Sequence, residues 1–338
     1  MEHGIVVFFL GLSLILYVTL GGADFGAGIL ELTAKRSVAR RLRDLTYHAI
    51  GPIWEANHVW IILVIVILFV GFPRAYAEIS TSLHIPLSLL LLGIIIRGAA
   101  FTFRHYDAIK DDSQHWYDAL FRGASAITPF FLGVCAGAVL LGEMRTDGTF
   151  PERFLSPWLN PFCFLIGAFL TALCAMLAAA FILGEVSRRD IMRHIKQRAF
   201  AWSLATVVLG GVVLLAGAQP KVALTDRFLQ HPVSLLCFAG ATVLLFVLWW
   251  AVYSERGVFA RIAAAGISGA ILLGWFAAQY PVLIHFKDGS HLTLDNAFAP
   301  PAAIDTLAWT LVGASLLIVP ALGALFWIFK RVAHRPAP

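Results

Sequence analysis

The sequence predicts an all-α integral membrane protein with about nine transmembrane helices. Of its 338 residues, 59% are hydrophobic and only 13% are charged, whereas a soluble domain carries about 25% charged residues. The apolar residues gather in runs of about 20 or more, the length that a helix needs to cross a hydrocarbon core about 30 Å thick. The basic residues gather in every second interval between these runs.

Nine apolar runs follow one another along the chain. The first begins within a few residues of Met1 and lacks the basic segment and cleavage site of a secretory signal, so we expect it to be retained as a membrane span. Between the spans, 184–199 is a candidate short surface helix, and 281–302 is a loop bounded by prolines. The predicted spans are 5–31, 45–71, 79–101, 119–142, 158–183, 200–217, 232–253, 259–280 and 303–329.

The basic residues predict the orientation of the chain. Eighteen of the 25 lysines and arginines lie after odd-numbered spans or in the C-terminal tail, six lie in the opposite intervals, and Arg97 lies within a span. Because basic residues mark the cytoplasmic side, we predict the N-terminus outside and the C-terminus inside, which requires an odd number of spans. The same placement accounts for the net charge of +5 without a nucleic-acid partner.

Two carboxylates lie inside the predicted spans, where a charge at the bilayer centre costs at least about 2.5 kcal/mol. Asp24 is about 10 Å from the cytoplasmic end of the first span, and Glu55 is about 15 Å inside the second. Both spans adjoin one cytoplasmic loop, so we expect the two carboxylates to be neighbours. Arg97, near the inner end of the third span, either extends to the interface or pairs with a carboxylate.

The neighbours of these carboxylates form a polar lane from the cytoplasmic side toward the membrane centre. At about 100° per residue, Tyr17 and two glycines share a stripe with Asp24, and His48 and His58 share an arc with Glu55. Pro52 removes a backbone hydrogen bond and frees a carbonyl that can bind water. Such a lane can relay protons. Alternatively, the carboxylates cross-link helices by hydrogen bonds or are held protonated by burial.

Haem or metal ligation on this chain is not expected. His58 and His84 differ in depth by about 12 Å, so they do not suit a haem between their helices. The cysteines lie inside apolar spans without a C-x-x-C pair, as small buried hydrophobic residues do; they are Cys135, Cys163, Cys174 and Cys237.

Several segments resemble subunit II of the cytochrome bd-type quinol oxidases. Residues 21–28, Gly-Gly-Ala-Asp-Phe-Gly-Ala-Gly, are similar to the segment that ends that family's first helix. Residues 50–60, Ile-Gly-Pro-Ile-Trp-Glu-Ala-Asn-His-Val-Trp, resemble its second-helix motif, with Glu55, Ala56 and His58 where Asp, Gly and Gln or Glu are usual. Further similar segments are Phe72-Pro73, Tyr76-Ala77, 97–104, 279–281 and 292–297.

The resemblance implies a fold and a role. The fold would be two four-helix bundles plus one helix, here 1–142, 158–280 and 303–329. The complex would oxidise quinol and reduce dioxygen to water, with haem b and haem d in the partner, subunit I. This chain would then hold no catalytic residue and would contribute a proton path through Asp24 and Glu55, supported by Asn57 and His58, with His48 on the same lane.

Two other functions stay open at this point. A proton-coupled transporter would use Asp24 and Glu55 as coupling sites, although spans six and seven offer no polar counterpart to span two. A self-sufficient membrane cytochrome is disfavoured by the histidine depths. For an oxidase subunit, the expected location is the prokaryotic cytoplasmic membrane, and membrane lipid and small accessory subunits are further candidate partners.

Overall fold

The computed structural model describes residues 1–50, 54–106, 114–186, 189–218 and 224–333, most of them helical. The first span is α1 (Glu2–Leu16), a π-helical turn η1 (Tyr17–Gly21) and α2 (Gly22–Leu32). The other long helices are α4 (Trp54–Gly71), α6 (His84–Tyr106), α7 (Gln114–Leu141), α9 (Pro161–Leu183), α10 (Arg189–Gly217), α12 (Pro232–Tyr253), α13 (Gly257–Gln279) and α15 (Pro301–Ala333). The shorter elements are α3 (Arg36–Ile50), α5 (Pro73–Ser82), α8 (Phe150–Phe154), α11 (Leu224–Gln230), α14 (Leu294–Ala297), β1 (Val282–His285) and β2 (His291–Thr293).

The predicted all-α membrane fold with about nine spans is confirmed for the described residues. Eight helices are long and apolar enough to cross a membrane, with α1 through α2 counted as one. The consecutive helices α4 and α5 form a ninth candidate span, bent by 118° between Gly71 and Pro73.

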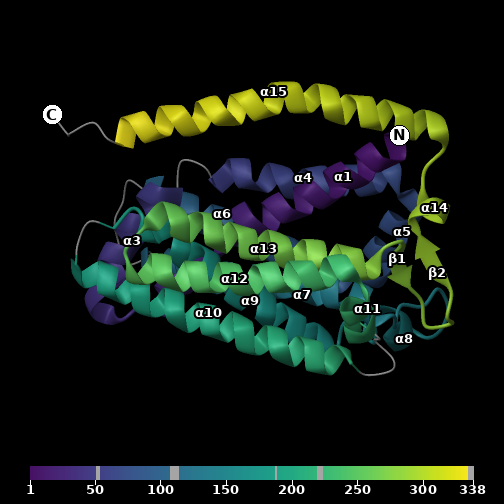
Figure 1. The fold of residues 1–338 in the computed structure, drawn as a ribbon, viewed down its shortest axis with the longest axis horizontal. Coiled ribbons are helices and arrows are strands. Elements are labelled where there is room, and N and C mark those ends of the chain that lie inside the picture. Colours follow the sequence, from purple (N-terminus) through teal and green to yellow (C-terminus); the bar gives the residue numbers. More distant parts are fainter. Residues whose placement is uncertain (51–53, 107–113, 187–188, 219–223, 334–338) are drawn as a thin grey trace.

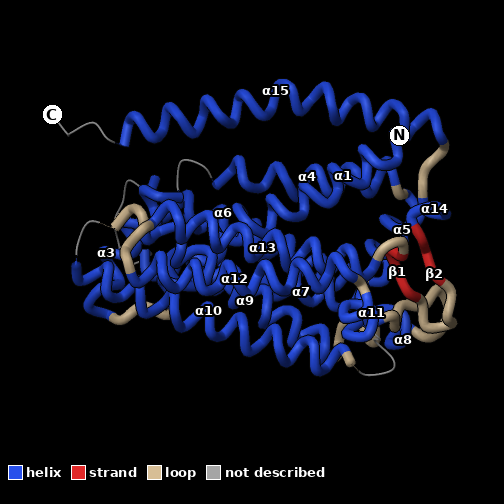
Figure 2. Tube along the Cα trace, viewed as in Figure 1, coloured by secondary structure: helices blue, strands red, loops and turns tan. Residues whose placement is uncertain are grey.

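The long helices run side by side along the longest dimension of the molecule (Figure 1). Figure 2 shows that both strands lie at one end of this bundle, close to α5, α8 and α14. The N-terminus lies at that end, whereas α15 begins there and runs toward the opposite end, where α3 lies. An odd number of crossings produces this placement. The assignment of the α3 end to the cytoplasm stays a prediction from the basic residues.

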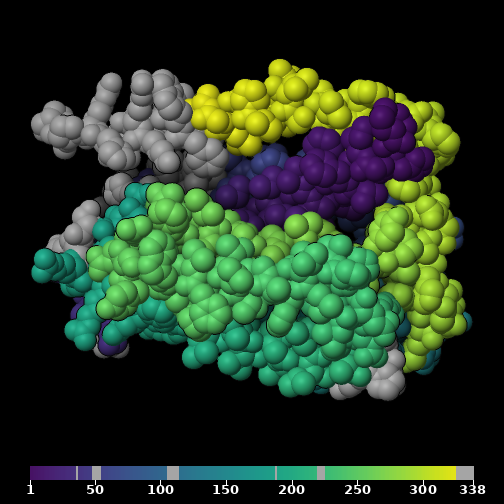
Figure 3. Space-filling model, in the orientation of Figure 1, coloured from purple at the N-terminus to yellow at the C-terminus, as the bar shows by residue number. Residues whose placement is uncertain are grey.

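The last helix, α15, lies along the edge of the helix assembly. It packs against α1 and α4 through buried apolar residues such as Ile304 and Leu307. Figure 3 shows it in yellow along the purple N-terminal helix. Its middle part exposes apolar side chains, including Leu316 and Leu317. This is the additional helix of the predicted fold, while the predicted bundle boundaries at 142 and 158 stay predictions.

The predicted span 45–71 is wrong in its first part. α3 ends at Ile50 and α4 begins at Trp54, while 51–53 lie outside the described residues. Residues 45–50 belong to α3. The earlier part of α3, which precedes the predicted span, carries four arginines and an aspartate, so α3 as a whole is not an apolar span. Glu55 is therefore the second residue of α4, not a residue ten positions inside a span.

Two further boundaries differ from the prediction. The third span begins at His84 rather than 79, because α5 ends at Ser82 and Leu83 separates it from α6. The candidate surface helix 184–199 is not separate: α10 starts at Arg189 and continues unbroken to Gly217. No proline or glycine interrupts 189–209, and long basic side chains can reach water from a helix end.

Glycines let α2 approach its neighbours closely. A Cβ atom at Gly26 would collide with the carbonyl of Cys174 on α9. A Cβ atom at Gly28 would collide with the side chain of Ser125 on α7. Small residues allow such close helix contacts in membranes. These two glycines therefore set the spacing of α2, α7 and α9 and bring Ser125 against α2.

The segment between α13 and α15 forms a small antiparallel hairpin, which the sequence did not predict. Its strands pair His285 with His291. The Nε2 atom of His285 is 2.5 Å from the Arg227 guanidinium, and its Nδ1 atom is 3.0 Å from Nδ1 of His291. Because a guanidinium only donates, His285 must accept at Nε2 and is neutral, with its proton on Nδ1. Burial of the ring, followed by the charges of Arg227 and His291, lowers the pKa of His285 to about 4.

We expect the hairpin to lose stability as the pH falls from 6.5 toward 4. An unfolded chain binds a proton at His285 near pH 6.5, whereas the folded chain does so near pH 4. The unfolded state therefore binds more protons in this window, and acid favours it. Hydrogen exchange of the hairpin amides as a function of pH measures this. The variant His285→Gln should flatten the response, and His115→Gln, an exposed histidine of α7, should leave it unchanged. An unchanged response in His285→Gln would contradict the assignment.

Candidate functional site

The first span is distorted at η1, a π-helical turn. Such turns are rare and are frequent at functional sites. Tyr17 begins the turn with its side chain buried, and Asp24 follows in α2. Asn57 of α4 donates a 3.5 Å hydrogen bond to the carbonyl of Leu20 within the turn. The distorted part of the first span is thus joined to the first part of α4.

Asp24 forms a fully buried ion pair with Arg97 of α6. The Arg97 Nη2 atom lies 2.5 Å from Asp24 Oδ1 and 3.2 Å from the Asp24 carbonyl oxygen. The Arg97 side chain is 1% exposed and the Asp24 side chain is 0% exposed. Arg97 Nε also donates to Ser125 Oγ at 3.2 Å, and Ser125 donates to the Phe121 carbonyl at 2.6 Å. Of the two roles left open for Arg97, the structure shows pairing with a carboxylate.

A second buried ion pair lies two helical turns further along the same two helices. Glu31 accepts from Arg104 through both oxygens, at 2.9 and 3.3 Å. Both side chains are at most 6% exposed. Each acid precedes its arginine by 73 residues, and seven residues along a helix correspond to about 10 Å. We call Asp24, Glu31, Arg97 and Arg104 the paired-charge ladder.

Aromatic rings enclose the arginines of the ladder. The Phe121 ring centroid is 5.1 Å from the Arg97 guanidinium carbon and 4.3 Å from that of Arg104. Phe25 covers Arg97 at 5.1 Å. The negative face of an aromatic ring attracts a cation, and the effect is stronger where water is excluded. The rings therefore stabilise both guanidinium groups inside an otherwise apolar helix interface.

Polar contacts continue from the Glu31–Arg104 pair to α3. Thr46 donates to Glu31 Oε1 at 2.5 Å. Arg104 lies 3.6 Å from Asp118, which also pairs with Arg43 at 2.7 Å. Arg43 and Asp118 are partly exposed. An unbroken set of polar contacts therefore leads from the surface at α3 to Glu31, and the next pair inward on the same helices is Asp24 and Arg97.

At its inner end, the ladder meets a group of rings. His58 lies with its ring centroid 6.2 Å from Tyr17 and 5.8 Å from Phe25. Asp24 and Arg97 are close enough to act electrostatically on both Tyr17 and His58. The Oδ2 atom of Asp24 and the hydroxyl of Tyr17 are buried without a hydrogen-bond partner among the described residues. Such atoms ordinarily bind internal water or a transferred proton.

The structure brings together only part of the predicted site. Asp24, His58 and Asn57 gather around η1, as described above. Glu55 is exposed at the start of α4 and makes no ion pair among the described residues, and its closeness to Asp24 stays a prediction. The backbone of His48 belongs to α3, but its side chain lies outside the described residues.

Sequence reasoning missed Glu31 and Arg104. Glu31 falls at the last position of the predicted first span, and Arg104 falls three residues beyond the predicted third span, so both read as interfacial charges. A signal was present, however. Asp24 and Glu31 are seven residues apart, as are Arg97 and Arg104, and this equal spacing lets both pairs form on the same two helix faces.

The chemistry of this site is acid–base and electrostatic. Carboxylates, an imidazole and a phenol can exchange protons with water, and the arginines stabilise the carboxylates as anions. No group of three or more His, Cys, Asp or Glu side chains able to hold a metal occurs within the described ranges. His58 contacts Tyr17 and Phe25, whereas His84 contacts Thr81 and Phe154, so these histidines do not form a facing pair for a haem.

Comparison with known proteins identifies the family of this chain. The family model described as cytochrome bd terminal oxidase subunit II matches residues 3–329. The chain belongs to this family. It is 26% identical over 331 residues to the cytochrome bd ubiquinol oxidase subunit 2 of Bacillus subtilis, an alignment that covers 94% of this chain and 92% of the relative. The fold also matches a chain of the bd oxidase structure from Geobacillus thermodenitrificans, with a TM-score of 0.77 at 17% identity, over 97% of this chain and 98% of that one.

Membership in the subunit II family confirms the hypothesis of an oxidase subunit and argues against that of a proton-coupled transporter. The chain is a subunit of a cytochrome bd-type terminal oxidase, an oxidoreductase complex that contains haem. Its apolar helices and its bacterial relatives identify it as a multi-pass protein of the prokaryotic cytoplasmic membrane. Another relative, subunit 2 of the Escherichia coli cytochrome bd-I ubiquinol oxidase, is 26% identical over 220 residues, 63% of this chain and 57% of the relative.

Proposed function

We propose that this chain is the non-haem subunit of a quinol-oxidising, dioxygen-reducing complex and supplies it with a proton path. The partner is subunit I, which carries haem b and haem d, and the N-terminus faces outward. The family match and relatives described as ubiquinol oxidase subunits support the pairing. The histidine contacts described above support the placement of the haems on the partner.

The proton path runs from the α3 end of the molecule toward η1. Its inner members are Asp24, His58 and Asn57, and Glu31 extends it toward the surface. His48, near the end of α3, and Glu55, at the start of α4, belong to the entrance of the path. One observation carries this assignment: Asp24 is fully buried, Arg97 holds one of its oxygens, and the other has no hydrogen-bond partner among the described residues.

The competing role for the same residues is structural. The ladder joins α2 to α6 by two buried ion pairs, as expected of carboxylates that cross-link helices. A cross-link requires only that both oxygens of the acid be satisfied. The unpartnered Oδ2 atom of Asp24, next to the electrostatically coupled Tyr17 and His58, favours the relay.

Purification by a tag on this chain in mild detergent, followed by a reduced-minus-oxidised spectrum, tests the pairing. We expect haem bands together with a second large membrane subunit, and no haem bands once that subunit is removed. A colourless chain that purifies alone would contradict the proposal. Haem bands that stay with the isolated chain would contradict the location of the cofactors.

Glu55→Gln should slow oxygen consumption by the assembled complex by about 100-fold or more, the effect of losing a positioned proton-transfer group. Because Glu55 is exposed and makes no ion pair among the described residues, the change should cost little stability. Oxygen uptake and haem content are measured together. Glu78→Gln on α5 is the matched control and should keep full turnover. Normal turnover and proton uptake in Glu55→Gln would exclude it from the path.

A further inference from the structure

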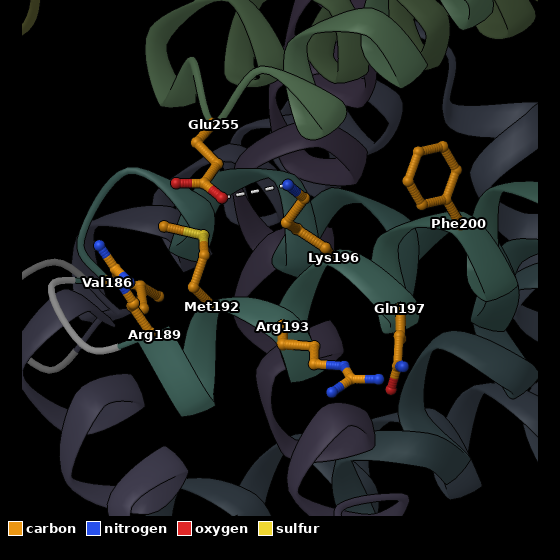
Figure 4. A pocket seen from close by; sticks show the side chains of 8 residues that line it. All are labelled: Val186, Arg189, Met192, Arg193, Lys196, Gln197, Phe200 and Glu255. Carbon is orange, nitrogen blue, oxygen red and sulfur yellow. Dashed lines mark hydrogen bonds and ion pairs between the residues drawn. The ribbon is translucent and has the colours of Figure 1, made fainter.

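A cavity of about 730 Å³ opens at the surface where α10 begins, close to the turn that joins α12 to α13. It is separate from the paired-charge ladder, and none of its lining residues takes part in the proposed proton path. Figure 4 shows the side chains around it, which come from α10, from the segment before it and from that turn. The proposed function assigns this cavity no role.

The cavity is lined by cations on one helix face. Arg189, Arg193 and Lys196 recur at the four- and three-residue spacing that places side chains on the same side of a helix. Arg189 and Arg193 are exposed, and neither takes part in an ion pair among the described residues. Lys196 pairs with Glu255 at 3.1 Å (Figure 4). Three cations against one carboxylate leave a net charge of +2 at the cavity.

Apolar side chains occupy the same face. Met192 lies between Arg189 and Arg193 along α10, and Phe200 follows one turn after Lys196; both are half-buried. These apolar side chains would not favour the binding of a small free anion. A molecule that joins an anionic head to a hydrocarbon body would contact both the cations and the apolar surface.

Aromatic residues mark the depth of the cavity in the membrane. Lys196 donates to the carbonyl of Tyr253 at 2.8 Å, and Tyr253 and Trp250 expose large parts of their rings. Arg256 lies 4.9 Å from the Trp250 ring centroid. Tyrosine and tryptophan concentrate at the level of the lipid headgroups. The cations of the cavity therefore stand at the height of the lipid phosphates.

We propose that this cavity binds the phosphodiester headgroup of an anionic phospholipid, with Arg189 and Arg193 on the phosphate and Met192 and Phe200 against the acyl chains. Basic pockets between membrane helices bind anionic lipid headgroups in this way. Guanidinium groups suit phosphate because they donate two parallel hydrogen bonds. Lys196 remains paired with Glu255 and keeps that carboxylate from repelling the lipid.

The test compares lipid retention by the assembled complex with that of the variant Arg189→Gln/Arg193→Gln. Complexes are reconstituted in phosphatidylcholine nanodiscs with or without phosphatidylglycerol, and bound lipid is counted by native mass spectrometry after release. Each arginine near a membrane surface contributes about fivefold to anionic-lipid affinity, so the variant should bind phosphatidylglycerol about 25-fold more weakly. Arg74→Gln removes an exposed arginine of α5, at the opposite end of the helix bundle, and should bind as the parent does.

Each outcome decides the proposal. Selective retention of phosphatidylglycerol that is lost only in the Arg189/Arg193 variant supports it. Equal retention in that variant, or equal retention of phosphatidylcholine by the parent, overturns it. Displacement of the lipid by millimolar inorganic phosphate, with phosphate itself retained by the parent, would instead identify a site for free anions. Haem spectrum and turnover serve as the folding control and are expected to be unchanged.

Discussion

Arg97→Met is expected to prevent stable assembly of the complex. Removing the guanidinium leaves the Asp24 carboxylate buried without its counter-charge, since both side chains are at most 1% exposed. Breaking a buried pair in this way costs about 3–5 kcal/mol, a large share of the stability of a typical domain. The thermal midpoint of the detergent-solubilised complex and its yield after tag purification measure the loss. Methionine has a similar length to the arginine stem, so the packing against Phe25 and Phe121 is partly kept.

The double variant Asp24→Leu/Arg97→Met is the matched control for this loss. Replacing a buried ion pair by apolar residues of similar volume is often neutral or stabilising. We therefore expect the double variant to assemble and to unfold near the temperature of the parent. If Arg97→Met alone were as stable as the parent, the carboxylate would not depend on Arg97, and the pair described here would be wrong.

Gly26→Ala is expected to have the second large effect. Its new methyl group would meet the Cys174 carbonyl and would approach Ala178 Cβ to 2.8 Å. Backbone atoms cannot move aside as a flexible side chain can, so α2 and α9 must separate. Overpacking of this kind costs about 1–3 kcal/mol or more. The separation also shifts the face that carries Asp24, so we expect both a lower thermal midpoint and slower oxygen consumption.

Gly123→Ala on α7 provides the control for glycine replacement. A methyl group there meets nothing within 4 Å among the described atoms. Alanine is favoured over glycine in a helix by about 1 kcal/mol, so this variant should be as stable as the parent or more so. A normal complex with Gly26→Ala would show that α2 and α9 are not in close contact.

Much of the fold could be predicted because a bilayer restricts what the chain can do. The apolar runs and the basic intervals between them predict the number of spans and the additional last helix, α15. Boundaries failed where charged residues continue a helix beyond the hydrocarbon, as at Arg189 and Arg104, since hydropathy cannot tell a helix end from a membrane surface. The strands Val282–His285 and His291–Thr293 were missed because three or four residues are too few to show a periodicity.

The candidate site was predicted less completely. Asp24 attracts attention because it interrupts an apolar run, but its partner lies 73 residues away on another helix. One sequence does not reveal which faces of two helices meet, so pairing and snorkelling of Arg97 remained equal alternatives. The depth of Glu55 depends on where the second span begins, and the structure places Glu55 in the first turn of α4. Glycine contacts such as Gly28 with Ser125 decide the helix spacing, and they become visible only in three dimensions.

The most direct test of the proton path uses the double variant Asp24→Leu/Arg97→Met in the complete complex, reconstituted in vesicles. Its haem spectrum and thermal midpoint establish assembly, and proton uptake is recorded together with oxygen consumption. We expect an assembled, spectrally normal complex in which both rates fall by about 100-fold or more, because the buried proton-transfer group has been removed. An assembled complex with parental rates would show that Asp24 only joins helices and would contradict the relay.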